Sequence, residues 1–557
     1  MATVSVARDT IESGRAGSPK LKRQVGLLGL TAVSLGSVIG SGWLLGTLGA
    51  AGYAGPASLV SWVLAAFMLV FIALMYAELG AAYPVSGGTA RYSLLSFGPL
   101  GGFAAGWMSW LQAVTLAPIE TEAAIRYLEP KWHGVVDTKT LLLTGKGLGF
   151  AILFIVFFTL VNLAGIRWMA GLNRFAVYWK ALIPVITIAA IAMTTFHPAN
   201  FHAGGGFSPF GVQGIFKALP GGVVFALLGF EQAAQFGGEA RDPQRDLPRA
   251  IIASLLLGVL LYLCLEVVLI GAINPANLAL PASWHHPLGS IGSYGPYAQM
   301  ATALGLGWLA VLLYIDAVVS PAGKGMLYVT TTSRITYSMG SAGTLPSAFE
   351  RIDRRSVPWF SVILASSFGV LVFLPFGGWN KLVVFISSAT AFMYAFAPVS
   401  LAALRRSDPD RYRPYRVPAA QVLAPLAFVF ANLIVYWGGW PAVWRISVGV
   451  AIGVALLGLT RATTPAARRQ PLNLKPAAWV VPWIGGIMVL DAIGPRYVSS
   501  YRQVVPFWWD LGAVALWSLL VFYLAQWLAL PREAVAANIE AARMATTEEE
   551  IELGIGA

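Results

Sequence analysis

The sequence contains a series of apolar runs, and each is long enough to cross a lipid bilayer as one helix. Residues 27–48, 56–82 and 507–530 are examples. A membrane-spanning helix needs about 20 predominantly apolar residues to cross roughly 30 Å of hydrocarbon. Together with 57% apolar residues, 11% charged residues and a mean hydropathy of +0.69, these runs predict an all-helical, polytopic membrane protein rather than a soluble domain.

The apolar runs predict about fourteen membrane spans. The thirteenth is interrupted by Pro482, Gly485, Gly486 and Asp491, so a re-entrant or interfacial helix is the alternative there. The expected spans are residues 27–48, 56–82, 99–125, 147–164, 172–195, 214–238, 250–273, 298–333, 358–376, 382–404, 420–438, 443–460, 477–495 and 507–530.

Most of the 37 Lys and Arg residues fall in the even-numbered loops and in the two tails. Clusters occur at residues 20–23, 241–249, 351–355 and 405–416. Because Lys and Arg stay preferentially on the cytoplasmic side of a membrane, both termini are predicted to be cytoplasmic. The net charge of +12 is then a consequence of topology, and no nucleic-acid partner is expected.

Two of the apolar runs are interrupted by glycines. The first span contains Gly36, Gly40 and Gly42, and the sixth contains Gly229 and Gly237. Unwound backbone at membrane depth offers free N–H and C=O groups, and broken helices at corresponding positions of two halves indicate the binding site of a secondary transporter. Spans one to five and six to ten are therefore predicted to form an inverted repeat of five helices each.

This organisation predicts one transport unit rather than a string of domains. An odd number of helices in each repeat gives the two repeats opposite orientations, as alternating access requires. The last four spans stand outside the repeat. The expected parts are a cytoplasmic tail at 1–24, the inverted-repeat core at 25–404, four C-terminal helices at 405–530 and a cytoplasmic tail at 531–557.

The first break has the composition of a carboxylate-binding site. Glycines at 36, 40 and 42 let the backbone leave helical geometry, and the next half-helix then points unpaired N–H groups and its positive end into a dry cavity. The expected ligand of Ile39, Gly40, Ser41 and Gly42 is the α-carboxylate of a substrate. The alternative is close helix packing through the Gly-xxx-Gly spacing of Gly36 and Gly40.

Six motifs follow one another along residues 22–420. They are Gly36 to Gly42, Tyr76-Ala77-Glu78-Leu79, Pro84-Val85-Ser86-Gly87-Gly88, Gly229-Phe230-Glu231, Gly238 to Pro248, and Ser333-Arg334 before Leu345-Pro346. In this order they resemble the amino acid, polyamine and organocation permeases, which implies a leucine-transporter-like core. Within that superfamily, residues 118–123, 314–334 and 506–511 are similar to the bacterial aspartate:proton symporter branch, which implies a bacterial inner membrane.

The same resemblance implies roles for the sixth span. Gly229 and Phe230, with Phe225, would form the gate and the site for the substrate's amino group. Glu231 is a carboxyl at membrane depth, where charge is costly. It would either bind the substrate ammonium or titrate, or else be a neutral, hydrogen-bonded acid. Near the cytoplasmic end of this span, Glu239 and Arg241 are expected to form gating salt bridges.

Lys180 is the candidate for coupling transport to protons. It lies inside the apolar fifth span, and burial makes it easier for a lysine to lose its charge. The resemblance implies that a lysine at this position replaces a sodium ion. Protonated, Lys180 would touch carbonyls between Gly36 and Gly40; deprotonated, it would release them. The alternative is that its side chain snorkels to the interface.

The charge of the substrate stays open from the residues alone. A dicarboxylic substrate needs a second cation or several hydroxyl donors, and Lys324, Arg126 and residues 330–333 are candidates. Glu120, Glu122 and Asp316 would repel such a substrate unless they are protonated or paired, and pairing with Lys324 would remove the free cation. These acids would instead suit a cationic substrate or a proton relay, in which Glu120 and Glu122 join Lys180.

The branch resemblance favours proton-coupled uptake of an acidic amino acid, aspartate or glutamate, by alternating access. A permease for neutral or cationic amino acids or polyamines, and a transport-silent membrane sensor, are the alternatives. An enzyme is not expected, because the five His and the lone Cys264 offer no catalytic or metal-binding spacing. No cofactor is expected beyond the proton as coupling ion, and the expected partners are the amino acid, protons and lipid.

Overall fold

The computed structural model describes residues 25–84, 87–137, 139–164, 166–235, 237, 240–289, 294–353, 357–373, 378–464, 472–495 and 504–540. These residues form helices and loops, with two isolated bridges and no strand among them. The main helices are α2 (Leu27–Val38), α3 (Thr47–Ala54), α4 (Ser58–Ala82), α5 (Gly88–Leu128), α6 (Gly145–Ala164), α7 (Ile166–Thr194), α8 (Gly211–Ala218), α9 (Val224–Leu227), α10 (Gln232–Gln235), α11 (Pro243–Ala272), α13 (Pro296–Ala303), α14 (Gly307–Ser341), α15 (Trp359–Leu371), α16 (Trp379–Ser407), α17 (Ala420–Gly438), α18 (Trp440–Thr463), α19 (Val480–Ile493) and α20 (Trp509–Leu528).

Apart from the eighth, the expected spans correspond to one helix or one broken helix each. Among the described residues, ten stretches have the length and hydropathy of a membrane span, and Lys475–Ile493, the thirteenth, is one of them. The expected eighth span, 298–333, is wrong at its start, because α13 and α14 are separate helices. Gly305, with φ +75°, turns the chain between them, a conformation that glycine adopts without strain.

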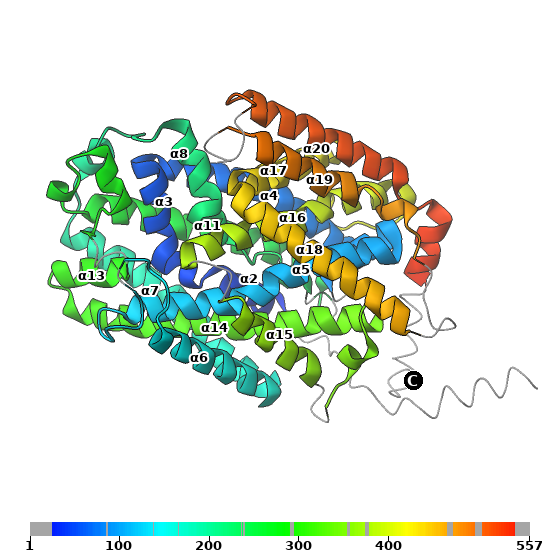
Figure 1. The fold of residues 1–557 in the computed structure, drawn as a ribbon, viewed down its shortest axis with the longest axis horizontal. Helices are drawn as coiled ribbons and strands as arrows, with labels where there is room; N and C mark the ends of the chain where they lie inside the picture. Colours follow the sequence, from blue (N-terminus) through cyan, green and yellow to red (C-terminus); the bar gives the residue numbers. More distant parts are fainter. Residues whose placement is uncertain are drawn as a thin grey trace, which may run out of the picture.

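The helices are arranged around α16, which is buried along nearly its whole length. In Figure 1, α6 and α15 lie along one edge of the molecule and α19 and α20 along the opposite edge, with α2, α5 and α11 between them. Helix α5 packs against both α14 and α16. The third expected span begins where α5 bends, at Gly98 with φ +74°.

The C-terminal helices are joined to one another by buried polar contacts. Asn432 of α17 accepts a hydrogen bond from the indole of Trp483 in α19 at 2.8 Å and donates one to Ser518 of α20 at 3.0 Å. Such side-chain bonds between membrane helices satisfy polar groups that lipid cannot. Since α17 also packs against α4 and α16, these helices form one body with the core.

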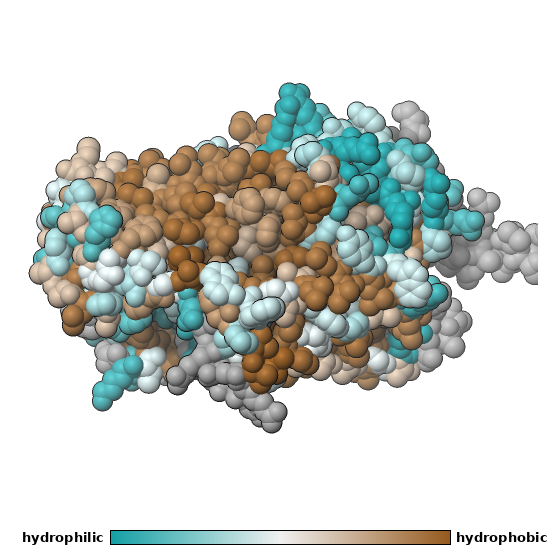
Figure 2. All heavy atoms as spheres, turned by 90° about the horizontal axis from the view of Figure 1, so that it is seen from above, coloured by the Kyte–Doolittle hydropathy of each residue, from teal (hydrophilic) through white to brown (hydrophobic). Residues whose placement is uncertain are grey.

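The surface has the apolar character of a lipid-facing protein. Figure 2 shows a broad continuous hydrophobic area, with hydrophilic residues gathered mostly toward one end. Large apolar side chains on the outer faces of the helices are exposed, including Leu153 of α6, Leu260 of α11 and Leu516 of α20. Exposed apolar patches of this extent are rare on soluble monomers. The chain is a multi-pass membrane protein.

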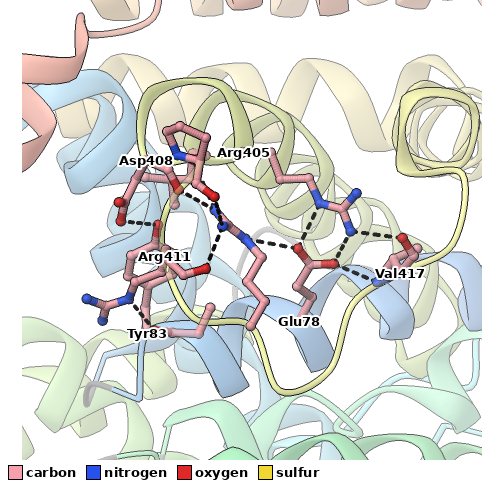
Figure 3. A network of polar contacts seen from close by, with 10 residues as sticks. Glu78, Tyr83, Arg405, Asp408, Arg411 and Val417 are labelled. Carbon is pink, nitrogen blue, oxygen red and sulfur yellow. Dashed lines mark hydrogen bonds and ion pairs between the residues drawn. The ribbon is translucent and has the colours of Figure 1, made fainter.

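A cluster of charged residues ties α4 to the loop after α16 (Figure 3). The buried carboxylate of Glu78 accepts a hydrogen bond from Arg405 Nε at 2.8 Å and from the backbone N–H of Val417 at 2.7 Å, and it pairs with Arg413 at 3.3 Å. Arg405 adds a second bond to the same carboxylate through its terminal nitrogen. One acid therefore holds two arginines and a backbone amide in place.

We expect Glu78→Ala to destabilise the protein by about 3–5 kcal/mol, because breaking a buried pair leaves uncompensated charge behind. Thermal unfolding of purified protein in detergent measures this. The matched control is Arg532→Ala, whose pair with Asp410 is exposed at 63% and 94% and should contribute at most about 1 kcal/mol. Equal unfolding temperatures for the two variants would contradict a structural role for Glu78.

Candidate functional site

The first span is broken where its glycines predict. Helix α2 ends at Val38, Ile39 is extended with ψ 107°, and a π-helical turn begins at Gly42. A side chain at Gly40 would collide with Lys324 and lie 2.9 Å from both carboxylate oxygens of Glu120. Glycine is needed at 40 because charged side chains from two other helices approach the backbone there.

The sixth span is broken beside the first. Leu228 is extended with ψ 139°, and Gly229 has φ +116°. A Cβ on Gly229 would lie 2.6 Å from the Cβ of Ser37 and 2.8 Å from its carbonyl carbon. Ser34 joins the two breaks, since its hydroxyl donates to the carbonyl of Phe230 at 3.0 Å and accepts from the N–H of Ala233 at 2.9 Å.

The carboxylate of Glu120, from α5, lies in the first-span break. Its Oε2 accepts a hydrogen bond from the backbone N–H of Ser41 at 2.6 Å, and its Oε1 lies 3.5 Å from the ammonium of Lys324 on α14. Lys324 also lies over the ring of Phe225, 5.0 Å from its centre. The glutamate, the lysine and the serine are all 0% exposed. The break is therefore closed to solvent in this structure.

Lys180 reaches the same break from α7. Its ammonium donates to the carbonyl of Gly36 at 2.7 Å, and its side chain is 0% exposed. Gly323 of α14 leaves room for it, because an added Cβ there would lie 3.0 Å from Cε of the lysine. The side chain thus points inward in this structure, rather than to the interface as the alternative would have it. Its role in coupling stays a prediction.

Asp316 of α14 adds a second acid. Its Oδ2 accepts from the indole of Trp43 at 3.1 Å and its Oδ1 from Ser320 at 2.6 Å, and it faces Lys180. Asp316, Glu120, Lys180 and Lys324 thus form a buried group of two acids and two bases with no net formal charge. Buried charges persist only when they are paired in this way.

Glu231 is fully engaged by neighbouring groups. Its Oε2 accepts from the hydroxyl of Tyr394 at 2.6 Å and from the N–H of Gly229 at 3.1 Å, and its Oε1 accepts from Gln232 at 3.0 Å. Phe230 lies against the same tyrosine, with ring centres 5.0 Å apart. These bonds fix the shape of the sixth-span break. Whether Glu231 binds the substrate ammonium, titrates or is a neutral acid stays a prediction.

Several expected site residues lie elsewhere. Glu122 is two residues from Glu120 on α5, so it faces another direction, and it lies beside Arg126 instead. Thr330 bonds to Asn162 of α6 at 2.5 Å. Arg241 is exposed, and its backbone N–H donates to Val25. Its expected partner Glu239 lies outside the described residues.

Sequence reasoning missed three residues that shape the site: Ser34, Tyr262 and Tyr394. The hydroxyl of Tyr262 on α11 donates to the carbonyl of Val38 at 3.0 Å and so holds the end of α2. Each is a polar residue within an apolar run, a signal that is visible in the sequence but does not identify a partner. Among the described residues, no group of three His, Cys, Asp or Glu side chains is placed to hold a metal ion.

Known proteins resemble this chain over most of its length. A model of the amino acid permease family matches residues 25–460. The glutamate/serine transporter AimA of Bacillus subtilis (strain 168) is 35% identical over 90% of this chain and 93% of its own length. The aspartate-proton symporter of that strain is 32% identical over 92% of this chain and 98% of its own. The branched-chain amino acid permease BcaP of the same strain is 26% identical over 79% of this chain and 93% of its own length. The chain belongs to the amino acid permease family and is a transporter, not an enzyme.

Proposed function

We propose that this protein takes up an acidic amino acid together with protons, by alternating access across a bacterial cell membrane with both termini in the cytoplasm. The contact between Lys180 and the carbonyl of Gly36 carries the proposal. A buried lysine on an unwound backbone can hold the first span when protonated and release it when neutral. The aspartate-proton symporter, 32% identical, supports both the coupling ion and the substrate class.

In this proposal the substrate's α-carboxylate binds the amides of Ile39 to Gly42, and its amino group binds near Gly229. Phe225 and Phe230 close over it. Lys324 is the cation for a second carboxylate once Glu120 has released it. Glu239 and Arg241 act as the gate toward the cytoplasm, and Glu122 remains a candidate on the proton path through its neighbour Arg126.

A small neutral amino acid such as serine is the second candidate. The pairing of Lys324 with Glu120 at 3.5 Å favours it, because a dicarboxylate would then meet no free cation at this break. The name of the glutamate/serine transporter, which is 35% identical to this chain, includes both an acidic and a neutral amino acid. The two candidates differ in which labelled amino acid is accumulated.

The test is uptake into proteoliposomes that contain the pure protein, with labelled L-aspartate, L-glutamate or L-serine. A gradient of two pH units supplies about 2.7 kcal/mol per proton, so roughly 100-fold accumulation is expected for one coupled proton. Excess arginine and putrescine serve as cationic competitors. Accumulation of serine alone would assign the neutral class. Uptake that ignores the pH gradient would contradict proton coupling, and no uptake of any amino acid would contradict the whole proposal.

A further inference from the structure

The first-span break already contains a carboxylate, and it belongs to the protein. Glu120 accepts from the N–H of Ser41 at 2.6 Å, and the turn that follows begins a half-helix whose positive end faces the same carboxylate. A substrate's α-carboxylate is expected at the same amide. Both oxygens of Glu120 lie 2.9 Å from where a Cβ of Gly40 would be. The internal acid therefore lies directly on the backbone that would recognise the substrate.

The groups around this carboxylate are only partly satisfied. The hydroxyl of Ser41, Oε1 of Glu120 and the ammonium of Lys324 are buried and make no hydrogen bond to any residue that the structure describes. Glu120 and Lys324 interact only as an ion pair at 3.5 Å. A buried cation and a buried hydroxyl without hydrogen bonds are costly, and a ligand carboxylate could satisfy both.

Two carboxylates cannot occupy one dry site while both are charged, because like charges at this range repel strongly at low dielectric. Substrate binding therefore requires that Glu120 gain a proton or leave. The titratable and charged groups around Glu120 are Lys324, Asp316 and Tyr328 on α14, Lys180 on α7, Tyr262 on α11 and Glu231 in the sixth-span break. The two lysines offset only two carboxylates, those of Glu120 and Asp316, so a substrate carboxylate beside charged Glu120 would leave an excess of negative charge at the break.

We propose that Glu120 is an internal competitor for the substrate's α-carboxylate, and that its protonation frees Ser41 and Lys324 for the amino acid. The inference rests on the proposed binding of an amino acid at the first-span break. It gives the proton a second task besides the one assigned to Lys180. When Glu120 is charged, its carboxylate occupies the amide of Ser41 that would bind the substrate. When Glu120 is neutral, that amide is available. Substrate binding therefore takes up a proton at Glu120.

The experiment measures the affinity of full-length protein in detergent for L-serine and L-glutamate between pH 5 and pH 8.5. Wild-type affinity should weaken up to about tenfold per pH unit once Glu120 is charged, because one proton is linked to binding. Glu120→Gln should bind at pH 8.5 at least about tenfold more tightly than wild type, with a nearly flat pH profile. Glu120→Ala is the second variant, because the amide oxygen of a glutamine at position 120 could still accept the hydrogen bond from the N–H of Ser41.

The control for neutralising a buried carboxyl is Glu266→Gln. Glu266 on α11 is buried and accepts hydrogen bonds from Ser58 and Trp62 of α4. Within the part of the chain that the structure describes, it makes no hydrogen bond to the amides of residues 39–42, so the pH profile of this variant should match wild type. For L-serinamide, which lacks the carboxylate, the affinities of wild type and Glu120→Gln should be the same. Proton uptake on mixing wild type with L-serine at pH 8 gives a second readout, and it should vanish in Glu120→Gln.

Wild-type pH dependence in both Glu120 variants would overturn the inference and leave amino acid transport standing. Weaker binding than wild type at every pH would overturn it too, because Glu120 would then be a ligand of the substrate and not its competitor. Failure of wild type to bind or transport any amino acid would instead contradict the proposed function. The two failures are therefore distinguishable.

Discussion

Lys180→Met should abolish proton-driven accumulation of the amino acid. Methionine keeps a long, flexible, apolar side chain in a site that is 0% exposed but cannot carry a proton. The bond from the ammonium to the carbonyl of Gly36, 2.7 Å long, is lost, so the first span no longer senses the proton. Against a gradient of two pH units, accumulation should fall from roughly 100-fold to about equal concentrations.

The measurement pairs gradient-driven uptake with counterflow exchange of the same labelled amino acid in proteoliposomes. Exchange should survive in Lys180→Met, since it needs binding and alternating access but no coupled proton. Lys217→Met, on the exposed side of α8, is the matched control and should accumulate substrate as wild type does. A Lys180 variant that still concentrates the amino acid with an unchanged response to pH would remove this residue from the coupling mechanism.

Gly229→Ala should reduce uptake about as severely as Lys180→Met, because it disturbs the backbone of the sixth-span break. Residue 229 has φ +116°, where a side chain costs about 1–3 kcal/mol. The added Cβ would also meet the backbone of Ser37 at 2.8 Å, and crowding of this kind costs a further 1–3 kcal/mol or so. Together these costs would raise the free energy of the conformation in which the two breaks touch by about 3 kcal/mol. Its population would then fall roughly 100-fold, and uptake should fall with it.

Gly206→Ala separates the two causes. Gly206 has φ +89°, but a Cβ there would meet nothing within 4 Å. It should therefore show only the modest loss of thermal stability due to its backbone conformation, with uptake unchanged. If Gly229→Ala transported like Gly206→Ala, close contact between the first and sixth spans would not matter for the transport cycle.

The sequence by itself determined the membrane class, the spans and the places where two of them break. These are local properties: hydropathy depends on about 20 consecutive residues, and glycine permits a broken helix wherever it occurs. The run from Gly36 to Gly42 was sufficient to predict the first break, and the depth of Lys180 in its apolar run was sufficient to make it a candidate. The sequence also identified Glu120 and Glu122 as unusual acids at membrane depth.

Only the tertiary structure decided which of these groups meet. Glu120 and Glu122 are equivalent in a hydropathy plot, but the rotation of α5 directs one to Ser41 and the other to Arg126. Tyr394 carries no motif, yet it bonds to Glu231 from 163 residues away. Lys180 and Gly36 are 144 residues apart. Such pairings depend on how helices from distant parts of the chain rotate and pack, a property that no local stretch of sequence contains.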